Sequence, residues 1–76
     1  MVMKMKMKIN LDTMKDAMAF VKAVSALEGD ITLTDGSGLR VNAKSTLGVI
    51  YSLEFSDLWV ESDRDIYSHI YQFMAE

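Results

Sequence analysis

The N-terminal residues alternate between apolar and charged side chains, and this pattern constrains the fold more than any other feature. From Met3 to Ile9, every second residue is methionine or isoleucine, and the residues between them are lysines. A period of two predicts a strand with one buried face and one solvated face. We therefore expect a sheet that is open to solvent on one side. The lysines also interrupt the apolar run, so a signal peptide core or a membrane span is not expected here.

The pattern then changes to a helical period. Asp12 or Thr13 is suited to cap a helix, and Asp16 lies where a carboxylate complements the amides and dipole of the first turn. Gly29 predicts where this helix stops. The expected inward positions are Met14, Ala17, Met18, Val21 and Val24, widened by Phe20, Ala23 and Leu27.

A hairpin and a short helix are predicted next. Residues 31–34 and 39–42 have strand patterns, and the turn formers at 35–38 join them. A short helix then begins with Ser45 in its first turn. Its expected buried positions are Leu47, Val49, Ile50 and Leu53.

The C-terminal part adds one strand and one helix. The strand is predicted at 58–61, and Ser62 or Asp63 is expected to cap the helix. The inward stripe of this helix is Ile66, Ile70 and Phe73. The element order βαββαβα predicts an α+β fold, an open-faced sandwich whose four-stranded, mostly antiparallel sheet carries three helices on one face. Residues 1–76 form a single domain in this prediction.

Composition excludes several classes of function. The chain has 76 residues, no cysteine and a net charge of −3 with scattered lysines. Disulfides and thiolate chemistry are therefore excluded, a cytoplasmic location is expected, and neither nucleic acid nor a membrane is an expected partner. His69 is the only histidine and lacks companions for a catalytic or metal site. We expect no enzyme activity, no cofactor and no metal.

Most of the chain, from about Ala17 to Glu76, resembles a known family. The matching segments are residues 20–22, Asp30–Leu33 with the glycine turn after it, and Val41–Ser45 together with Gly48 and Val49. They are similar to HPr, the histidine-phosphorylated carrier of the bacterial sugar phosphotransferase system. The resemblance implies the HPr-like open-faced β-sandwich.

The resemblance places Ser45 at a regulatory position. In Gram-positive members of the family, a dedicated kinase phosphorylates this serine, and the product binds a transcriptional regulator of carbon catabolite repression. The residues alone leave a second interpretation open, in which Ser45 is only a helix cap. Further candidates for partner binding lie beside it: Lys44, Thr46, Leu47, Ile50 and Tyr51.

The active site of the family is not reproduced. Counting back from residues 20–22 places Thr13 at the histidine, Lys15 at the arginine and Asp16 at the proline of the family motif. A phosphothreonine is a stable ester that does not pass its phosphate onward, and Asp16 adds a negative charge that opposes an incoming phosphate. The chain thus resembles a degenerate, Crh-like member without phosphohistidine carrier activity.

Three functional hypotheses remain from the sequence. The first is a regulatory or protein-interaction module of the phosphotransferase system or of carbon catabolite control. Its partners would be an HPr-kinase-like enzyme, a transcriptional regulator or phosphotransferase components. The second is a binding or structural subunit that is never phosphorylated. The third is an active carrier that uses His69 or Thr13. A second interface is expected if the aromatic residues Phe55, Trp59, Tyr67 and Tyr71 cluster on one side.

Overall fold

The computed structural model of the chain describes residues 5–75, and its elements follow the predicted order βαββαβα. The strands are β1 (Met5–Lys8), β2 (Ile31–Thr34), β3 (Arg40–Asn42) and β4 (Trp59–Ser62). The helices are α1 (Met14–Ser25), α2 (Thr46–Ser52) and α3 (Tyr67–Ile70), and a short 3-10 helix, η1 (Tyr71–Phe73), follows α3.

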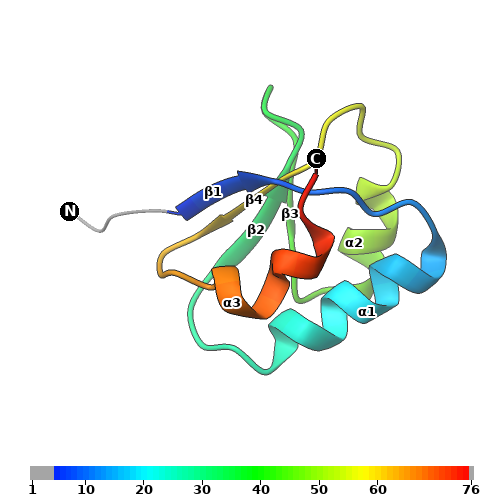
Figure 1. Cartoon of the computed structure of the whole chain (residues 1–76). Coiled ribbons are helices and arrows are strands. Elements are labelled where there is room, and N and C mark those ends of the chain that lie inside the picture. Colours follow the sequence, from blue (N-terminus) through cyan, green and yellow to red (C-terminus); the bar gives the residue numbers. More distant parts are fainter. Residues whose placement is uncertain (1–4, 76) are drawn as a thin grey trace.

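The four strands form one antiparallel sheet in the order β1-β4-β2-β3. The first strand therefore pairs with the last, and the β2–β3 hairpin lies on the other side of β4. The helices lie together on one side of this sheet (Figure 1). The predicted open-faced α+β architecture is confirmed.

Strand β1 shows the alternation that the sequence predicts. Its methionines are half-buried and pack against the core, while its lysines are exposed. Ile9 continues the apolar side and is fully buried. Met3 and Lys4, which the prediction also assigned to this strand, lie outside the described residues.

The C-terminal segment extends the sheet beyond β1. Residues 73–75 run antiparallel to residues 8–10 and are joined to them by an isolated bridge. The backbone N–H of Ala75 donates to the carbonyl of Lys8 (3.0 Å), and that of Asn10 donates to the C-terminal segment (2.8 Å). Part of the outer edge of the N-terminal strand is thereby covered.

Helix α1 begins at its predicted cap, but its buried side is narrower than predicted. Thr13 has extended backbone angles, and its hydroxyl accepts a hydrogen bond from the N–H of Asp16 (3.1 Å). The prediction that Met14 and Met18 point inward was wrong, since they are 52% and 49% exposed. At 3.6 residues per turn, they lie to one side of the true stripe. That stripe is Ala17, Phe20, Val21 and Val24.

The predicted stop at Gly29 was also wrong, because α1 already ends at Ser25 with Ala26 as its C-cap. Gly29 lies in the connection to β2 with a φ of +94°. A Cβ there would approach the Oδ1 of Asp63 to 2.5 Å and the Nε of Arg64 to 2.9 Å. This glycine is required by a left-handed backbone and by a close approach of the loop after β4.

Helix α2 buries fewer residues than predicted. Val49 is fully buried, whereas Ile50 and Leu53 are half-buried. Leu47 was predicted to be buried and is 80% exposed. Two residues correspond to about 200° of rotation around a helix, so Leu47 lies opposite Val49. A helix of only two turns that lies at the surface of the molecule buries one narrow side.

The last helix begins later than predicted. Ser62 does not cap it but is the last residue of β4, because β4 pairs with strands on both sides up to this point. Its Oγ accepts a hydrogen bond from the N–H of Arg64 (3.2 Å). The helix starts at Tyr67, whose N–H donates to the Oδ1 of Asp65 (3.0 Å). The predicted inward residues are all buried: Ile66, Ile70 and Phe73.

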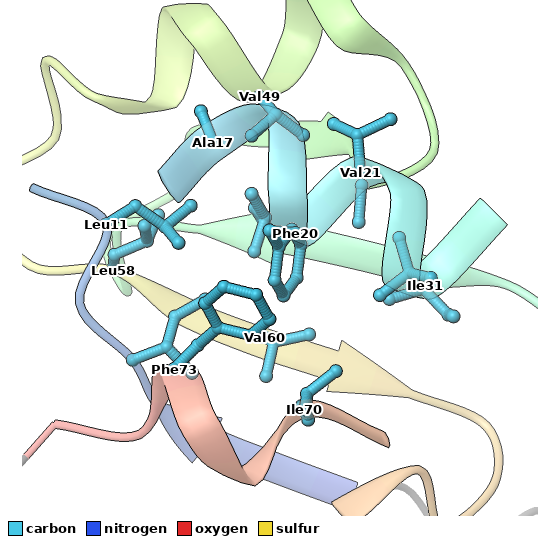
Figure 2. Packing of buried hydrophobic residues seen from close by; sticks show 14 of the residues in the cluster. Leu11, Ala17, Phe20, Val21, Ile31, Val49, Leu58, Val60, Ile70 and Phe73 are labelled. Atoms are coloured by element: carbon cyan, nitrogen blue, oxygen red, sulfur yellow. The ribbon is translucent and has the colours of Figure 1, made fainter. Parts of the chain in front are cut away.

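The core lies between the sheet and the three helices (Figure 2). Phe20 of α1 is fully buried, and its ring meets the ring of Phe73 edge to face with centroids 5.3 Å apart. Leu33 and Val60 contribute the facing side chains of the two central strands. The edge-to-face pair therefore joins the first helix to the C-terminal segment over the middle of the sheet.

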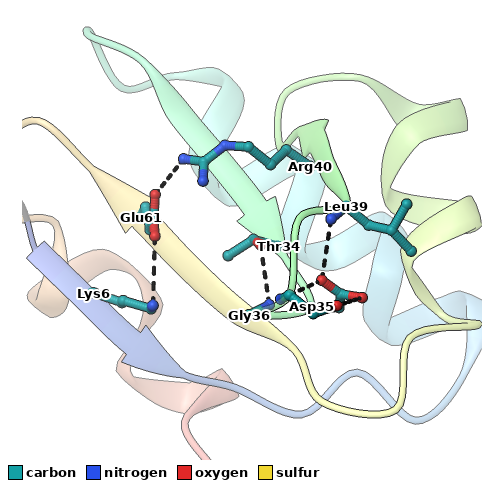
Figure 3. A network of polar contacts seen from close by, with 8 residues as sticks. Lys6, Thr34, Asp35, Gly36, Leu39, Arg40 and Glu61 are labelled. Atoms are coloured by element: carbon teal, nitrogen blue, oxygen red, sulfur yellow. Dashed lines mark hydrogen bonds and ion pairs between the residues drawn. The ribbon is translucent and has the colours of Figure 1, made fainter.

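The open face of the sheet is held by its own polar contacts (Figure 3). Glu61 on β4 forms ion pairs with Lys6 on β1 (3.7 Å) and with Arg40 on β3. The ammonium groups of Lys6 and Lys8 lie 5.3 and 6.0 Å from the centre of the Trp59 ring. These contacts connect strands at both edges of the sheet to β4.

The hairpin turn is organised by Asp35 (Figure 3). Its Oδ1 accepts hydrogen bonds from the backbone N–H groups of Ser37 (2.8 Å) and Leu39 (3.2 Å). Its Oδ2 accepts one from the hydroxyl of Ser37 (2.8 Å). These bonds, first of all that from the Ser37 N–H, lower the pKa of the Asp35 carboxyl below its ordinary value.

Candidate functional site

Ser45 is the N-cap of α2. Its backbone is extended (φ −95°, ψ 120°), and its Oγ accepts a hydrogen bond from the N–H of Gly48 at 3.2 Å. The carbonyl of Ser45 accepts the first helical hydrogen bond, from the N–H of Val49 (2.9 Å). The side chain is half-buried. The hydroxyl therefore has a structural partner at the start of the helix.

Lys44 precedes this serine and contacts the segment that follows α1. Its ammonium group donates to the carbonyl of Leu27, just after the end of α1. Its backbone N–H donates to the Oδ1 of Asn42 (2.9 Å). A cation at a helix C-terminus compensates the unpaired carbonyls there. Lys44 thus joins the loop before α2 to the end of α1.

The other predicted binding residues differ in their exposure. Thr46 and Leu47 are exposed in the first turn of α2, and Ile50 is half-buried. Tyr51 is 53% exposed in the second turn, and its ring meets that of Phe55 edge to face with centroids 5.7 Å apart. The structure therefore brings Ser45, Thr46 and Leu47 together at one end of α2 and places Tyr51 towards the other.

Sequence reasoning missed the exposure of Met14 and Met18 on the neighbouring helix α1. Helices α1 and α2 pack side by side, and these methionines are exposed on α1 as Leu47 and Tyr51 are on α2. A signal was present in the sequence, since residues 17, 20, 21 and 24 alone complete a helical stripe. Any further large apolar residue on that helix was a candidate for the surface.

The start of α1 forms a separate site. The Thr13 hydroxyl accepts from the N–H of Asp16, and the Asp16 Oδ2 in turn accepts from the N–H of Asp12 (3.1 Å). A carboxylate of the chain itself therefore occupies the end of the helix where an anion is favoured. Lys15 is exposed and forms no ion pair with another residue in the range 5–75.

A hollow of about 430 Å³ separates the end of α2 from the segment that precedes α1. Leu53 and Phe55 line it from one side, and Asn10, Leu11 and Asp12 line it from the other. The start of α1 is thus close to the second turn of α2. Ser45 lies at the opposite end of that helix.

The aromatic residues do not gather on one side. Trp59 lies on the open face of the sheet under two lysines, and Phe55 lies beside Tyr51 after α2. Tyr67 and Tyr71 are exposed next to each other on α3 and η1, with ring centroids 6.3 Å apart. The aromatic interface considered from the sequence is therefore divided among three places.

Residues 5–75 contain no cluster of three or more histidine, cysteine or acidic side chains arranged to hold a metal ion. His69 is exposed on α3. Within the same residues, every helix is too short or too polar to cross a bilayer. Comparisons of the chain with protein-family models, with curated proteins and with solved structures found no match.

Proposed function

We propose that this protein is a cytoplasmic regulatory module that binds other proteins through α1 and α2 and is switched by phosphorylation at Ser45. The observation that carries the proposal is the pair of adjacent helices with exposed large apolar side chains, one of which begins at Ser45. The resemblance of Val41–Ser45 to the regulatory segment of HPr supports the choice of serine. Histidine phosphotransfer and catalysis have no part in this function.

The charge of α1 supports a protein as the partner. Lys15 and Lys22 are exposed on α1, and neither forms an ion pair with another residue in the range 5–75. An apolar surface flanked by free cations fits a partner that presents apolar and acidic side chains. The candidates are an HPr-kinase-like enzyme, a transcriptional regulator and components of the phosphotransferase system.

A phosphate at Ser45 would change this surface without changing the fold. Phosphorylation adds about 1.5 to 2 negative charges, which are favoured at a helix N-terminus. The ammonium of Lys44 is hydrogen-bonded to the carbonyl of Leu27. The added charge would lie at the end of α2 beside the exposed Thr46 and Leu47, where a partner would meet it.

A second function is favoured by the hydrogen bond from Gly48 to Ser45. A serine that caps a helix needs no further role. In this alternative, the protein is a binding or structural subunit that is never phosphorylated. A carrier role has less support, because the Asp16 carboxylate lies at the start of α1 beside Thr13.

The deciding experiment is intact-mass spectrometry of the purified chain after incubation with two separate donors. One donor is the phosphoenolpyruvate-dependent first enzyme of the phosphotransferase system, and the other is the ATP-dependent HPr kinase. We expect one phosphate from the kinase alone, lost in Ser45→Ala and retained in the control Ser56→Ala, which removes an exposed serine elsewhere in the chain.

The other outcomes separate the alternatives. An acid-labile phosphate from the first enzyme would show a carrier and overturn the proposal. No transfer from either donor would favour the unphosphorylated binding subunit. A phosphate that persists in Ser45→Ala would place the switch at a different residue.

A further inference from the structure

Methionine supplies all the sulfur of this chain, which has seven methionines and no cysteine. Among residues 5–75, Met74 in the C-terminal segment is 39% exposed, and the other four methionines lie in two kinds of environment. Met5 and Met7 of β1 are half-buried and pack against the core. Met14 and Met18 of α1 are half exposed and take no part in that core. An oxidant in solution therefore reaches the second pair more easily than the first.

The two exposed methionines lie on the same part of the surface of α1. They are four residues apart, so their side chains are neighbours on one side of the helix. Lys15 lies between them in sequence, and the adjacent helix α2 exposes Leu47 and Tyr51. A change of polarity at Met14 and Met18 thus alters the apolar surface of α1 and leaves the packing of the sheet untouched.

We propose that Met14 and Met18 are a site of selective, reversible oxidation by hydrogen peroxide. A lone pair of the thioether sulfur attacks one peroxide oxygen and forms an S–O bond while the O–O bond breaks. The departing hydroxide takes up the proton of the new sulfur-bound hydroxyl group and leaves as water. The sulfur loses two electrons and becomes a sulfoxide, while the peroxide is reduced. Methionine sulfoxide reductases restore the thioether.

The consequence rests on the proposed function, because the oxidised residues belong to the surface proposed to bind partners. Two sulfoxides convert an apolar side of α1 into a polar one, which weakens docking through apolar contact. This would make partner binding respond to peroxide in a chain that has no thiol.

The test is a peroxide titration of the full chain, followed by peptide mapping of each methionine. We expect Met14 and Met18 to be oxidised roughly five-fold faster, or more, than Met5 and Met7. The melting temperature of the singly and doubly oxidised chain should change by less than about 2 °C. Treatment with both methionine sulfoxide reductases should return the original mass.

The double variant Met14→Leu and Met18→Leu is the matched control, because it keeps the apolar surface and removes both reactive sulfurs. It should lose oxidation at positions 14 and 18 and keep it at Met5 and Met7. Equal oxidation rates at all four positions, a large drop in melting temperature, or failure of the reductases would each overturn the proposal. None of these readouts involves Ser45, so the phosphorylation experiment can fail or succeed independently.

Discussion

At the scale of single residues, Ser45 combines a measurable structural role with the proposed regulatory one. The bond between its hydroxyl and the N–H of Gly48 closes the first turn of α2. Ser45→Ala is expected to lower the free energy of unfolding by about 1 kcal/mol, whereas Ser45→Asp should leave it nearly unchanged. Urea denaturation measures both. An aspartate variant as unstable as the alanine variant would contradict the capping role.

Asp35 gives a pH dependence whose sign follows from its hydrogen bonds. Its pKa is lowered from 3.8 by the N–H and hydroxyl of Ser37. A carboxyl with a lowered pKa in the folded state stabilises the fold above its unfolded pKa, and this contribution is lost as the pH falls through the folded pKa. Asp35→Ala should therefore be less stable than the wild type at neutral pH, and the difference should shrink below about pH 3.8. Urea denaturation across the acidic range measures it, and a constant difference would contradict the assignment.

At the scale of elements, α1 shows which part of the fold its own sequence determines. Its cap could be predicted because Thr13 and Asp16 interact within one turn. The side that it buries could not be predicted fully, because Met14 and Met18 are as apolar as the residues that pack inward. Only the position of the sheet and of Phe73 decides which side is covered. The failure of Ser62 to cap α3 has the same origin, since the pairing of β4 on both sides keeps this residue in the sheet.

The two sides of α1 should differ strongly on substitution. Phe20→Ala removes a fully buried ring and is expected to cost about 3–5 kcal/mol, while Met18→Ala should stay within about 0.5 kcal/mol. Because the first loss approaches the whole stability of a small domain, Phe20→Leu, with an expected loss of about 1 kcal/mol, provides a folded comparison. Chemical denaturation measures all three. A larger loss for Met18→Ala than for Phe20→Leu would contradict the assigned sides.

Gly29 and Gly36 provide a matched pair for the connections between elements. Both have positive φ values, of 94° and 85°, so an alanine at either costs about 1–2 kcal/mol. Only at Gly29 would the new methyl group clash, with Asp63 and Arg64. Gly29→Ala should therefore lower the melting temperature more than Gly36→Ala, as calorimetry would show. An equal decrease in melting temperature for both variants would mean that the loop after β4 moves aside without an energetic cost.

At the scale of the whole molecule, the open face of the sheet depends on Glu61, which pairs with cations on both edge strands. Glu61→Gln is expected to lower the free energy of unfolding by up to about 1 kcal/mol at low salt. The loss should shrink in 1 M salt, where the screening length is about 3 Å. The control Glu28→Gln alters a highly exposed carboxylate, 4.0 Å from Arg64, and should have no effect.

The arrangement of the sheet and helices could be predicted from the sequence, but the exposure of several surface residues could not. The alternation in β1, the turn residues at 35–38 and the helical stripes are local, and they were sufficient for the element order and the open-faced sheet. The exposure of Leu47 and the bond between Lys44 and Leu27 depend on residues distant in the chain. For that reason, the sequence was sufficient to locate the candidate site at Ser45, but not to predict which neighbouring side chains are exposed around it.

The pairing of residues 73–75 with residues 8–10 bears on how the protein forms during synthesis. β1 is synthesised before its neighbours, which are β4 and the segment ending at Ala75. While the ribosome holds these late segments in its exit tunnel, β1 has no strand to join, and the core is missing Phe73. The sheet is thus completed only after residue 75 has left the tunnel, through contacts of high sequence separation that form slowly. Until then, Met5 and Met7 of the nascent β1 strand are accessible to chaperones.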